Sequence, residues 1–329
     1  MSVKNKTFFS IIVPAYNAGK DIHKTIDSVL AQSFDNWELI IVDDCSTDNT
    51  KDVVCTYSEK NPNIKYTSLE KNSGNAKKPR DYGVSISKGD YCVMLDSDDA
   101  LSEDYLEKIH NKIISEQADV VISVMEMREL ETKALVNILP RQDFTMPPYG
   151  QDACKYILSS WSFSGGGIAF CRELYKYVND LNPYYYCYSD EMSERILVYY
   201  AKKVSLSSGV YTYWQHKDSI THKCSPKLFE MLNVDLNLIE FTKKRYGQDE
   251  VDEVCISTLR HMLSLYKKYL QNYREFSTDI CSNIESIFQT AYRCLQKINW
   301  NKKGVKQRVY MINFMLFKWI NKCMFLIKK

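Results

Sequence analysis

The sequence predicts an α/β fold in which a mostly parallel sheet is flanked by helices, with an α-helical extension at its C-terminal end. Four short apolar runs lie in the first part of the chain, at residues 8–13, 39–42, 91–95 and 120–124. They are continuous rather than alternating, as in strands that are buried on both faces of a parallel sheet. Helical patterns separate them, and strands that alternate with helices form right-handed βαβ units.

The helices are predicted from apolar residues that recur at helical spacing. Two such stretches follow the first and third apolar runs, at residues 22–30 and 101–113. Ser102, with two acids behind it, is a good N-cap for the second of these helices. After residue 140 the chain reads as a proline-rich loop and an aromatic segment, and then as a helix at 192–201.

The length and composition are those of a globular protein with about two domains. The chain has 329 residues, of which 45% are hydrophobic and 26% charged, and its net charge is +2. So small a net charge produces no field that would attract a nucleic acid, and we expect no nucleic-acid partner. We predict an α/β domain at residues 1–225 and a helical domain at residues 226–329.

Cysteine usage and hydropathy both predict a cytoplasmic protein. The 11 cysteines include no C-x-x-C pair, and Cys92 lies inside an apolar run. Reduced thiols therefore fit better than a zinc site or a disulfide framework. The apolar run near the N-terminus is too short for a signal peptide, and no stretch of about 18 apolar residues occurs.

Polar and acidic side chains follow three of the apolar runs. Because ligands bind beyond the carboxyl ends of parallel strands, we expect these side chains to meet at one edge of the sheet and form the site. In chain order they are Pro14-Ala15-Tyr16-Asn17, Asp43-Asp44 and Asp96-x-Asp98-Asp99.

The third acidic group raises the question of a cation. Three carboxylates at one strand end repel one another unless a positive charge lies among them. Carboxylates in D-x-D spacing, with no Cys or His nearby, suit Mg²⁺ or Mn²⁺, which keep positions open for phosphate oxygens. An acidic turn that caps the helix after Ser102 would explain one or two of the acids, but three at once favour the metal. The two common glycine-rich patterns that bind the phosphates of nucleotides, G-x-G-x-x-G after the first run and G-x-x-x-x-G-K-[ST], do not occur. A phosphate ligand would therefore have to be held by the metal and by basic side chains.

Two stretches carry a family resemblance, "SIIVPAYNAGKDIHKTIDSVLAQSFDNWELIIVDDCSTDNT" and "RDYGVSISKGDYCVMLDSDDAL". Together they closely resemble the family 2 inverting glycosyltransferases of the GT-A fold, densely over residues 8–125 and more loosely to 222. The resemblance implies transfer of a sugar from a nucleotide-sugar donor, expected to be a UDP-sugar, to a hydroxyl of a glycan or lipid-linked glycan in bacterial surface-polysaccharide synthesis. It implies that residues 1–100 bind the nucleotide sugar and residues 101–225 the acceptor.

The resemblance also assigns the nucleotide to the predicted sheet edge. Asp44 is expected to accept a hydrogen bond from the imide of the base, with a neighbouring role for Asp43. We expect Ser46 to cap a helix that begins near Thr47, which would leave the two acids for the ligand. The expected lining of the base pocket is Pro14, Ala15, Tyr16 and Asn17.

The stretch "GNAKKPRDYG" matches the family pattern A-R-N-x-G, with Arg80 in the arginine position. Arg80 or Lys78 is implied to contact the diphosphate or the donor sugar. The alternative for Lys77 and Lys78 is a solvated basic turn, which we favour for both. Asp81 replaces the commoner asparagine, so no role is assigned to it.

The acidic group and one histidine complete the donor site that the resemblance implies. Asp96 and Asp98 are expected to bind the nucleotide sugar. Asp98, Asp99 and His216 are expected to hold Mn²⁺ or Mg²⁺ as the cofactor.

Inverting transfer needs one carboxylate that takes the proton from the acceptor hydroxyl during in-line attack. A metal-bound diphosphate leaves without help from an acid. The family supplies this base from an E-D pair before a helix, and in "YSDEMSERILVYYAKK" Asp190 occupies the Asp position and Ser189 the Glu position. Asp190 is the predicted base and Glu191 the alternative. Trp161 and Gly166 are expected to shape the acceptor site.

Two other functions stay open at this point. A nucleotidyltransferase would use a similar sheet and D-x-D group, but it would carry a glycine- and arginine-rich loop after its first strand, which "VPAYNAGKDI" lacks. A non-catalytic module that binds a carbohydrate or nucleotide would not need Asp98 and Asp190 intact.

The last segment of the chain, residues 309–327, is mostly apolar but interrupted by polar residues and flanked by lysines. It is too polar to span a bilayer and suits a helix that lies in an anionic membrane interface, at the inner face of the cell membrane. The alternative is a last helix packed on its domain.

Overall fold

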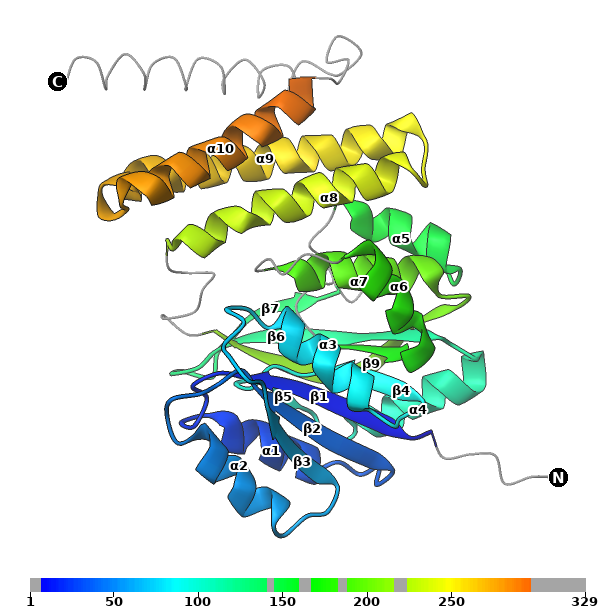
Figure 1. The fold of residues 1–329 in the computed structure, drawn as a ribbon. Helices are drawn as coiled ribbons and strands as arrows, with labels where there is room; N and C mark the ends of the chain where they lie inside the picture. Colours follow the sequence, from blue (N-terminus) through cyan, green and yellow to red (C-terminus); the bar gives the residue numbers. More distant parts are fainter. Residues whose placement is uncertain (1–6, 141–144, 160–166, 183–187, 216–223, 297–329) are drawn as a thin grey trace. The chain divides into compact units, whose positions relative to one another are not determined.

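The structure is a computed structural model. It describes residues 7–140, 145–159, 167–182, 188–215 and 224–296 (Figure 1). The chain divides into two compact units, residues 1–219 and residues 220–329.

The first unit alternates strands and helices in its N-terminal half. These elements are β1 (Phe9–Ala15), α1 (Ile22–Leu30), β2 (Trp37–Asp43), α2 (Thr50–Ser58), β3 (Ile64–Ser68), α3 (Lys77–Ile86), β4 (Tyr91–Met94), β5 (Ala100–Leu101) and α4 (Tyr105–Glu116). They are followed by β6 (Val120–Glu129), β7 (Leu135–Leu139), α5 (Gly150–Leu158), β8 (Ile168–Cys171), α6 (Tyr175–Leu181), α7 (Ser189–Tyr200) and β9 (Val204–Gln215).

The nine strands found in the described residues form one sheet, in the order β3-β2-β1-β4-β8-β6-β9-β5, with β7 paired to β6. The pairs β1–β2, β1–β4, β2–β3 and β6–β9 are parallel, whereas β8 is antiparallel to both of its neighbours. The four predicted apolar runs are strands β1, β2, β4 and β6. The predicted α/β fold with a mostly parallel sheet is confirmed.

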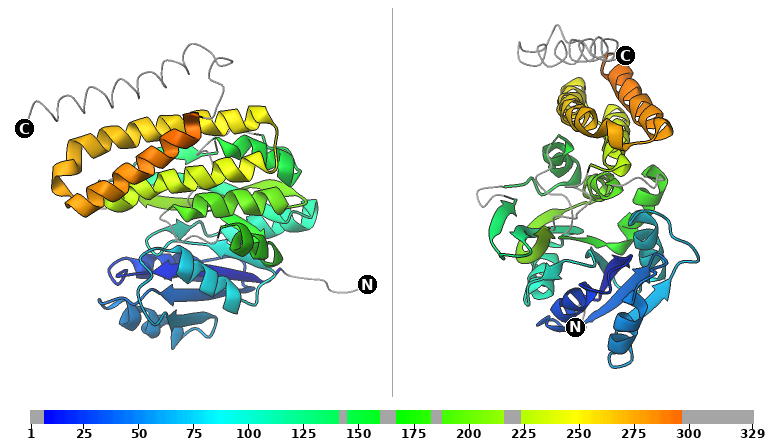
Figure 2. Two further views of the ribbon diagram at one scale, coloured as in Figure 1. Left: turned by 45° about the horizontal axis from the view of Figure 1, so that its top comes forward. Right: turned by 90° about the vertical axis from the view of Figure 1, so that its left-hand side faces the viewer.

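Helices cover both faces of this sheet (Figure 2). Side chains of β1 alternate between the two faces, and Ile11 and Val13 belong to the core cluster that contains α1 and α4 residues such as Ile26 and Tyr105. Ile12 points the other way, and a Cβ added at Gly83 of α3 would lie 2.4 Å from its Cγ2 atom. Because both faces are packed, every residue of β1 and β2 is buried. This explains why the two strands read as continuous apolar runs.

The predicted helix start at Ser102 is wrong. The preceding residues form the short strand β5, which pairs with β9, and α4 begins only at Tyr105. The Ser102 N–H donates to the carbonyl of Val210, and the Ser102 hydroxyl accepts from the Val210 N–H. Pairing with a strand more than a hundred positions away therefore outweighs the local capping signal.

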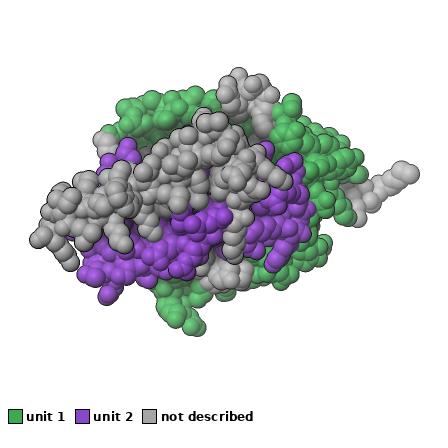
Figure 3. Space-filling model, turned by 90° about the horizontal axis from the view of Figure 1, so that it is seen from above, with its two compact units in different colours: residues 1–219 green, residues 220–329 purple. Residues whose placement is uncertain are grey.

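The second unit, coloured purple in Figure 3, is helical where the structure describes it. It contains α8 (Met231–Lys243), α9 (Gln248–Asn272) and α10 (Thr278–Gln296). Buried Phe229, Met262 and Phe288 contribute to its apolar interior. The predicted helical C-terminal region is confirmed up to the end of α10.

The segment at 309–327 lies outside the described residues, so its predicted membrane contact stays a prediction. No helix within the described ranges combines the length and the hydropathy that a bilayer crossing requires.

Candidate active site

The carboxyl ends of β1 and β2 bring the first two predicted groups together. In the parallel register Ala15 lies opposite Asp43, so the loops that follow these strands start side by side. Asn17, whose φ is 50°, ties the two loops together, because its N–H donates to the Ser46 hydroxyl and its side-chain oxygen accepts from the Thr47 N–H.

The residues expected to line the base pocket therefore lie at this edge, as predicted. Pro14 and Ala15 are buried, whereas the Tyr16 ring is 51% exposed. An exposed aromatic ring at a strand end is available to stack on a flat ligand such as a base.

Asp43 and Asp44 are both buried and both hold loops. Asp43 accepts from the Ser46 N–H at 2.9 Å, from the Ser46 hydroxyl and from the Tyr66 hydroxyl. Asp44 accepts from the Ser73 N–H at 2.8 Å and from the Ser73 hydroxyl at 2.9 Å.

The expectation that Ser46 caps a helix and leaves the acids for the ligand is wrong. Helix α2 begins at Thr50 rather than near Thr47, and Ser46 is bound to Asp43 instead. The contact of Asp44 with a nucleotide base stays a prediction, and such a contact would compete with Ser73.

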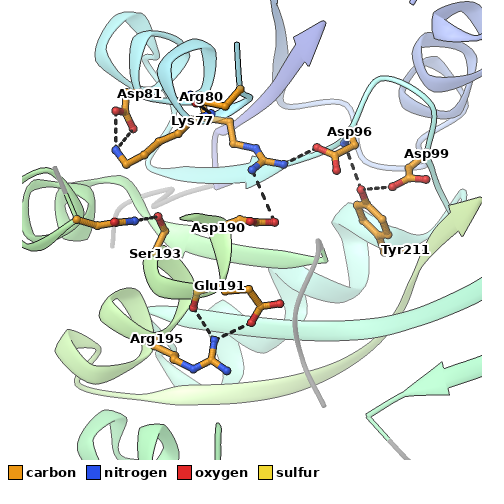
Figure 4. Close-up of polar contacts among 12 residues, drawn as sticks. Lys77, Arg80, Asp81, Asp96, Asp99, Asp190, Glu191, Ser193, Arg195 and Tyr211 are labelled. Carbon is orange, nitrogen blue, oxygen red and sulfur yellow. Dashed lines mark hydrogen bonds and ion pairs between the residues drawn. The ribbon is translucent and has the colours of Figure 1, made fainter. Parts of the chain in front are cut away.

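Arg80 is the centre of the site (Figure 4). From α3, its guanidinium donates to an Asp96 carboxylate oxygen at 2.6 Å, and another of its nitrogens lies 3.8 Å from a carboxylate oxygen of Asp190. Burial alone would lower the pKa of Arg80, but the Asp96 and Asp190 carboxylates raise it overall. One cation thus joins the D-x-D group after β4 to the first turn of α7.

A second buried cation lies one turn earlier on α3. Lys77 is only 4% exposed, and its Nζ donates to both carboxylate oxygens of Asp81, at 2.7 and 2.9 Å. The Tyr175 hydroxyl donates to the same carboxylate at 2.8 Å. The expectation of a solvated turn is therefore wrong for Lys77, because the acid at position 81 gives it a partner inside the protein.

Asp99 connects the acidic group to β9 through hydrogen bonds. Its side chain is fully buried and accepts from the Tyr211 hydroxyl at 2.7 Å and from the Trp214 N–H at 2.9 Å. Burial, together with the nearby charges of Asp98 and Asp96, raises the pKa of Asp99 well above its usual range. Both Asp99 oxygens are thus engaged by the fold, and its role as a metal ligand stays a prediction.

Asp98 lies in the same group and is partly exposed. Among the residues that the structure describes, no cluster of three His, Cys, Asp or Glu side chains is arranged to hold a metal ion. Three other predicted residues, His216, Trp161 and Gly166, lie outside the described ranges.

The two candidate bases point in different directions (Figure 4). The Asp190 side chain is 28% exposed and faces Arg80. Glu191 is 5% exposed and forms an ion pair of 2.7 Å with Arg195, which lies one turn further along α7. Its carboxylate is occupied inside the protein, so the structure disfavours Glu191 as the alternative base.

Asp190 lines a pocket that lies between α3 and α7. One helical stripe of α7, with members three and four residues apart, forms one side of it. This stripe contains Glu194, which sequence reasoning missed although its spacing from Asp190 was a usable signal. The lining residues are Lys77, Arg80, Met94, Asp96, Ile168, Tyr175, Asp190, Ser193, Glu194, Leu197 and Tyr211.

The chain matches known glycosyltransferases along its sequence. GlyG of Streptococcus pneumoniae, a glycosyltransferase, is 25% identical over 300 residues, which cover 86% of this chain and 97% of GlyG. TarP of Staphylococcus aureus, a poly(ribitol-phosphate) beta-N-acetylglucosaminyltransferase, is 42% identical over 117 residues, which cover 34% of this chain and 35% of TarP. The chain thus spans nearly all of GlyG but about a third of TarP.

Solved structures show the same fold. The crystal structure of residues 1–349 of S. aureus TarS superposes with a TM-score of 0.61 at 22% identity, covering 86% of this chain and 80% of that one. The same TarS region in complex with UDP-GlcNAc gives a TM-score of 0.60 at 20% identity, covering 93% of this chain and 79% of that one. This likeness confirms the predicted GT-A-like fold.

The profile of glycosyl transferase family 2 matches residues 10–178. That range contains all but the first residue of β1, the acidic group after β4 and Arg80, so the resemblance seen in the sequence is confirmed. The chain belongs to glycosyl transferase family 2 and is a glycosyltransferase.

Proposed function

We propose that the protein transfers a sugar from a UDP-sugar, with inversion, to a hydroxyl of a glycan or lipid-linked glycan acceptor in the synthesis of a surface polysaccharide. The observation that carries the proposal is the Arg80 bridge between Asp96 and Asp190. It supports a single site in which the donor-binding strand end faces one carboxylate of α7.

The donor assignment draws support from the relatives. TarS has been crystallised with UDP-GlcNAc and with UDP, and TarP is named as an N-acetylglucosaminyltransferase. UDP-GlcNAc is therefore the first donor to test. Membership of the family favours an enzyme over the non-catalytic binding module.

In the proposed reaction the acceptor hydroxyl attacks the anomeric carbon of the donor while the bond from that carbon to the diphosphate breaks. Asp190 takes the proton of the attacking hydroxyl, and the electron pair of the broken bond leaves with UDP. Arg80 holds the Asp190 carboxylate in the pocket and, at 13% exposure, keeps a cation beside the leaving group.

The oxygen-rich group after β4 fits the metal that the family implies. We assign the metal contact to Asp98, a partly exposed carboxylate of this group, with His216 as a second candidate for binding Mn²⁺ or Mg²⁺. When bound, the metal would neutralise charge on the diphosphate. The cytoplasmic location and the contact with the inner face of the membrane belong to the same proposal.

We expect the purified protein to release UDP from UDP-GlcNAc in the presence of Mn²⁺, slowly with water as the acceptor. Coupled detection of UDP would measure this, and detection of pyrophosphate in parallel samples that contain UTP and N-acetylglucosamine 1-phosphate would test the nucleotidyltransferase alternative. UDP without pyrophosphate agrees with the proposal. Pyrophosphate from UTP and a sugar phosphate, without UDP release from any UDP-sugar, would refute it.

A further inference from the structure

The pocket next to Asp190 has two chemically different sides. One side comes from α3 and β4, in the half of the chain that the proposed function assigns to the donor, and it presents Arg80 and Asp96. The facing side is the α7 stripe, which presents Asp190 and, one turn further, Glu194. A sugar between these sides that has its anomeric carbon near Asp190 has its remaining groups within reach of Glu194, because side chains at i and i+4 are about 5–6 Å apart.

The positively charged side chains around the pocket form ion pairs with other acids. Arg80 is bonded to Asp96, Lys77 to Asp81 and Arg195 to Glu191. Within the described parts of the chain, no hydrogen bond or salt bridge engages the Glu194 carboxyl. Glu194 is therefore an acid that lines the pocket and has no hydrogen-bond or ion-pair partner among the described residues.

The surroundings of Glu194 favour its neutral form. Burial, reinforced by the charges of Glu191 and Asp190, raises its pKa well above the usual range for a glutamate. A neutral carboxyl group both donates and accepts hydrogen bonds, as do the hydroxyl groups of a sugar. A perturbed acid in a pocket is also more often functional than one on a plain surface.

We propose that Glu194 is a specificity-determining residue that hydrogen-bonds a hydroxyl or amide group of the transferred sugar, on the side of the ring away from the anomeric carbon. This inference rests on the proposed function, since it needs a UDP-sugar in the pocket. In this role Glu194 selects for an uncharged sugar such as a hexose or N-acetylhexosamine. The nucleotide lies beyond this contact, so UDP alone does not engage Glu194.

The test compares the binding of UDP and of UDP-GlcNAc by titration calorimetry, in Mn²⁺, for the full chain and three variants. Glu194→Met keeps the side-chain volume but cannot form the hydrogen bond. We expect it to weaken UDP-GlcNAc binding by about fivefold to thirtyfold and to leave UDP binding unchanged. Glu194→Gln, which keeps both donor and acceptor, should bind UDP-GlcNAc within about threefold of the parent.

Glu240→Gln, at a site on α8 that is 60% exposed, serves as the matched control and should change neither affinity. Equal weakening of UDP and UDP-GlcNAc in Glu194→Met would assign Glu194 a merely structural role, and unchanged binding of both would place it away from the donor. Either result overturns the inference. A loss of UDP-GlcNAc binding in Glu194→Gln as large as in Glu194→Met would do so as well.

The parent protein separates this inference from the proposed function. If the parent neither binds nor hydrolyses UDP-GlcNAc or another UDP-sugar, the proposed function fails, and the role of Glu194 fails with it. If the parent does both and Glu194→Met retains the full difference in affinity between UDP and UDP-GlcNAc, only the role of Glu194 is wrong.

Discussion

Replacement of Asp190 by asparagine is expected to lower kcat for UDP release by about two or more orders of magnitude, because the amide keeps the shape of the side chain but cannot take the proton of the attacking hydroxyl. Donor binding should persist, since Arg80 keeps its bond of 2.6 Å to Asp96. Steady-state rates with UDP-GlcNAc and calorimetric titration with UDP would measure the two quantities separately.

Glu191→Gln is the matched control for this variant. Glu191 is paired with Arg195 inside the protein, so its replacement should lower the thermal stability of the protein. We expect kcat for UDP release to change little. An inactive Glu191→Gln together with an active Asp190→Asn would show that the base assignment is displaced by one residue.

Removal of the Asp98 carboxylate should abolish turnover and weaken UDP binding in Mn²⁺. A metal held beside the diphosphate stabilises the charge that develops on the leaving group, and loss of a ligand removes this stabilisation from the transition state. The comparison is between Asp98→Ala and the parent protein, in UDP release and in UDP affinity, with and without Mn²⁺.

Glu103→Ala, at an exposed position just beyond β5, controls for the loss of a negative charge in the neighbourhood and should behave like the parent. Full activity of Asp98→Ala, or activity of the parent that persists unchanged in excess EDTA, would rule out the proposed metal site.

Much of the fold could be predicted because the central strands carry a strong local signal. In β1 and β2 both faces are packed, and this burial appears in the sequence as unbroken apolar runs. Strand β3 lies at the edge of the sheet, only its first residue is buried, and its sequence "IKYTS" has no such run. Strand β8 has four residues, and its antiparallel position between β4 and β6 depends on pairings far apart in the chain.

In the site, too, contacts between residues far apart in the chain could not be predicted from the sequence. The sequence pattern placed the polar groups at the strand ends and singled out Arg80, Asp96 and Asp190, which the structure brings together. It could not show that Asp99 is bound by Tyr211, which lies 112 positions away. Local charge spacing was also insufficient for Lys77, because whether its ion pair with Asp81 is buried depends on how α3 packs in the fold.

The stereochemistry of sugar release from UDP-GlcNAc tests the central claim most directly. UDP-GlcNAc is an α-anomer, and a water molecule that is deprotonated by Asp190 attacks from the face opposite the diphosphate. Proton NMR spectra recorded from the first minutes of hydrolysis, before the free sugar mutarotates, would identify the anomer that forms first. The account predicts β-N-acetylglucosamine, and α-N-acetylglucosamine as the first product would contradict in-line attack assisted by a single carboxylate.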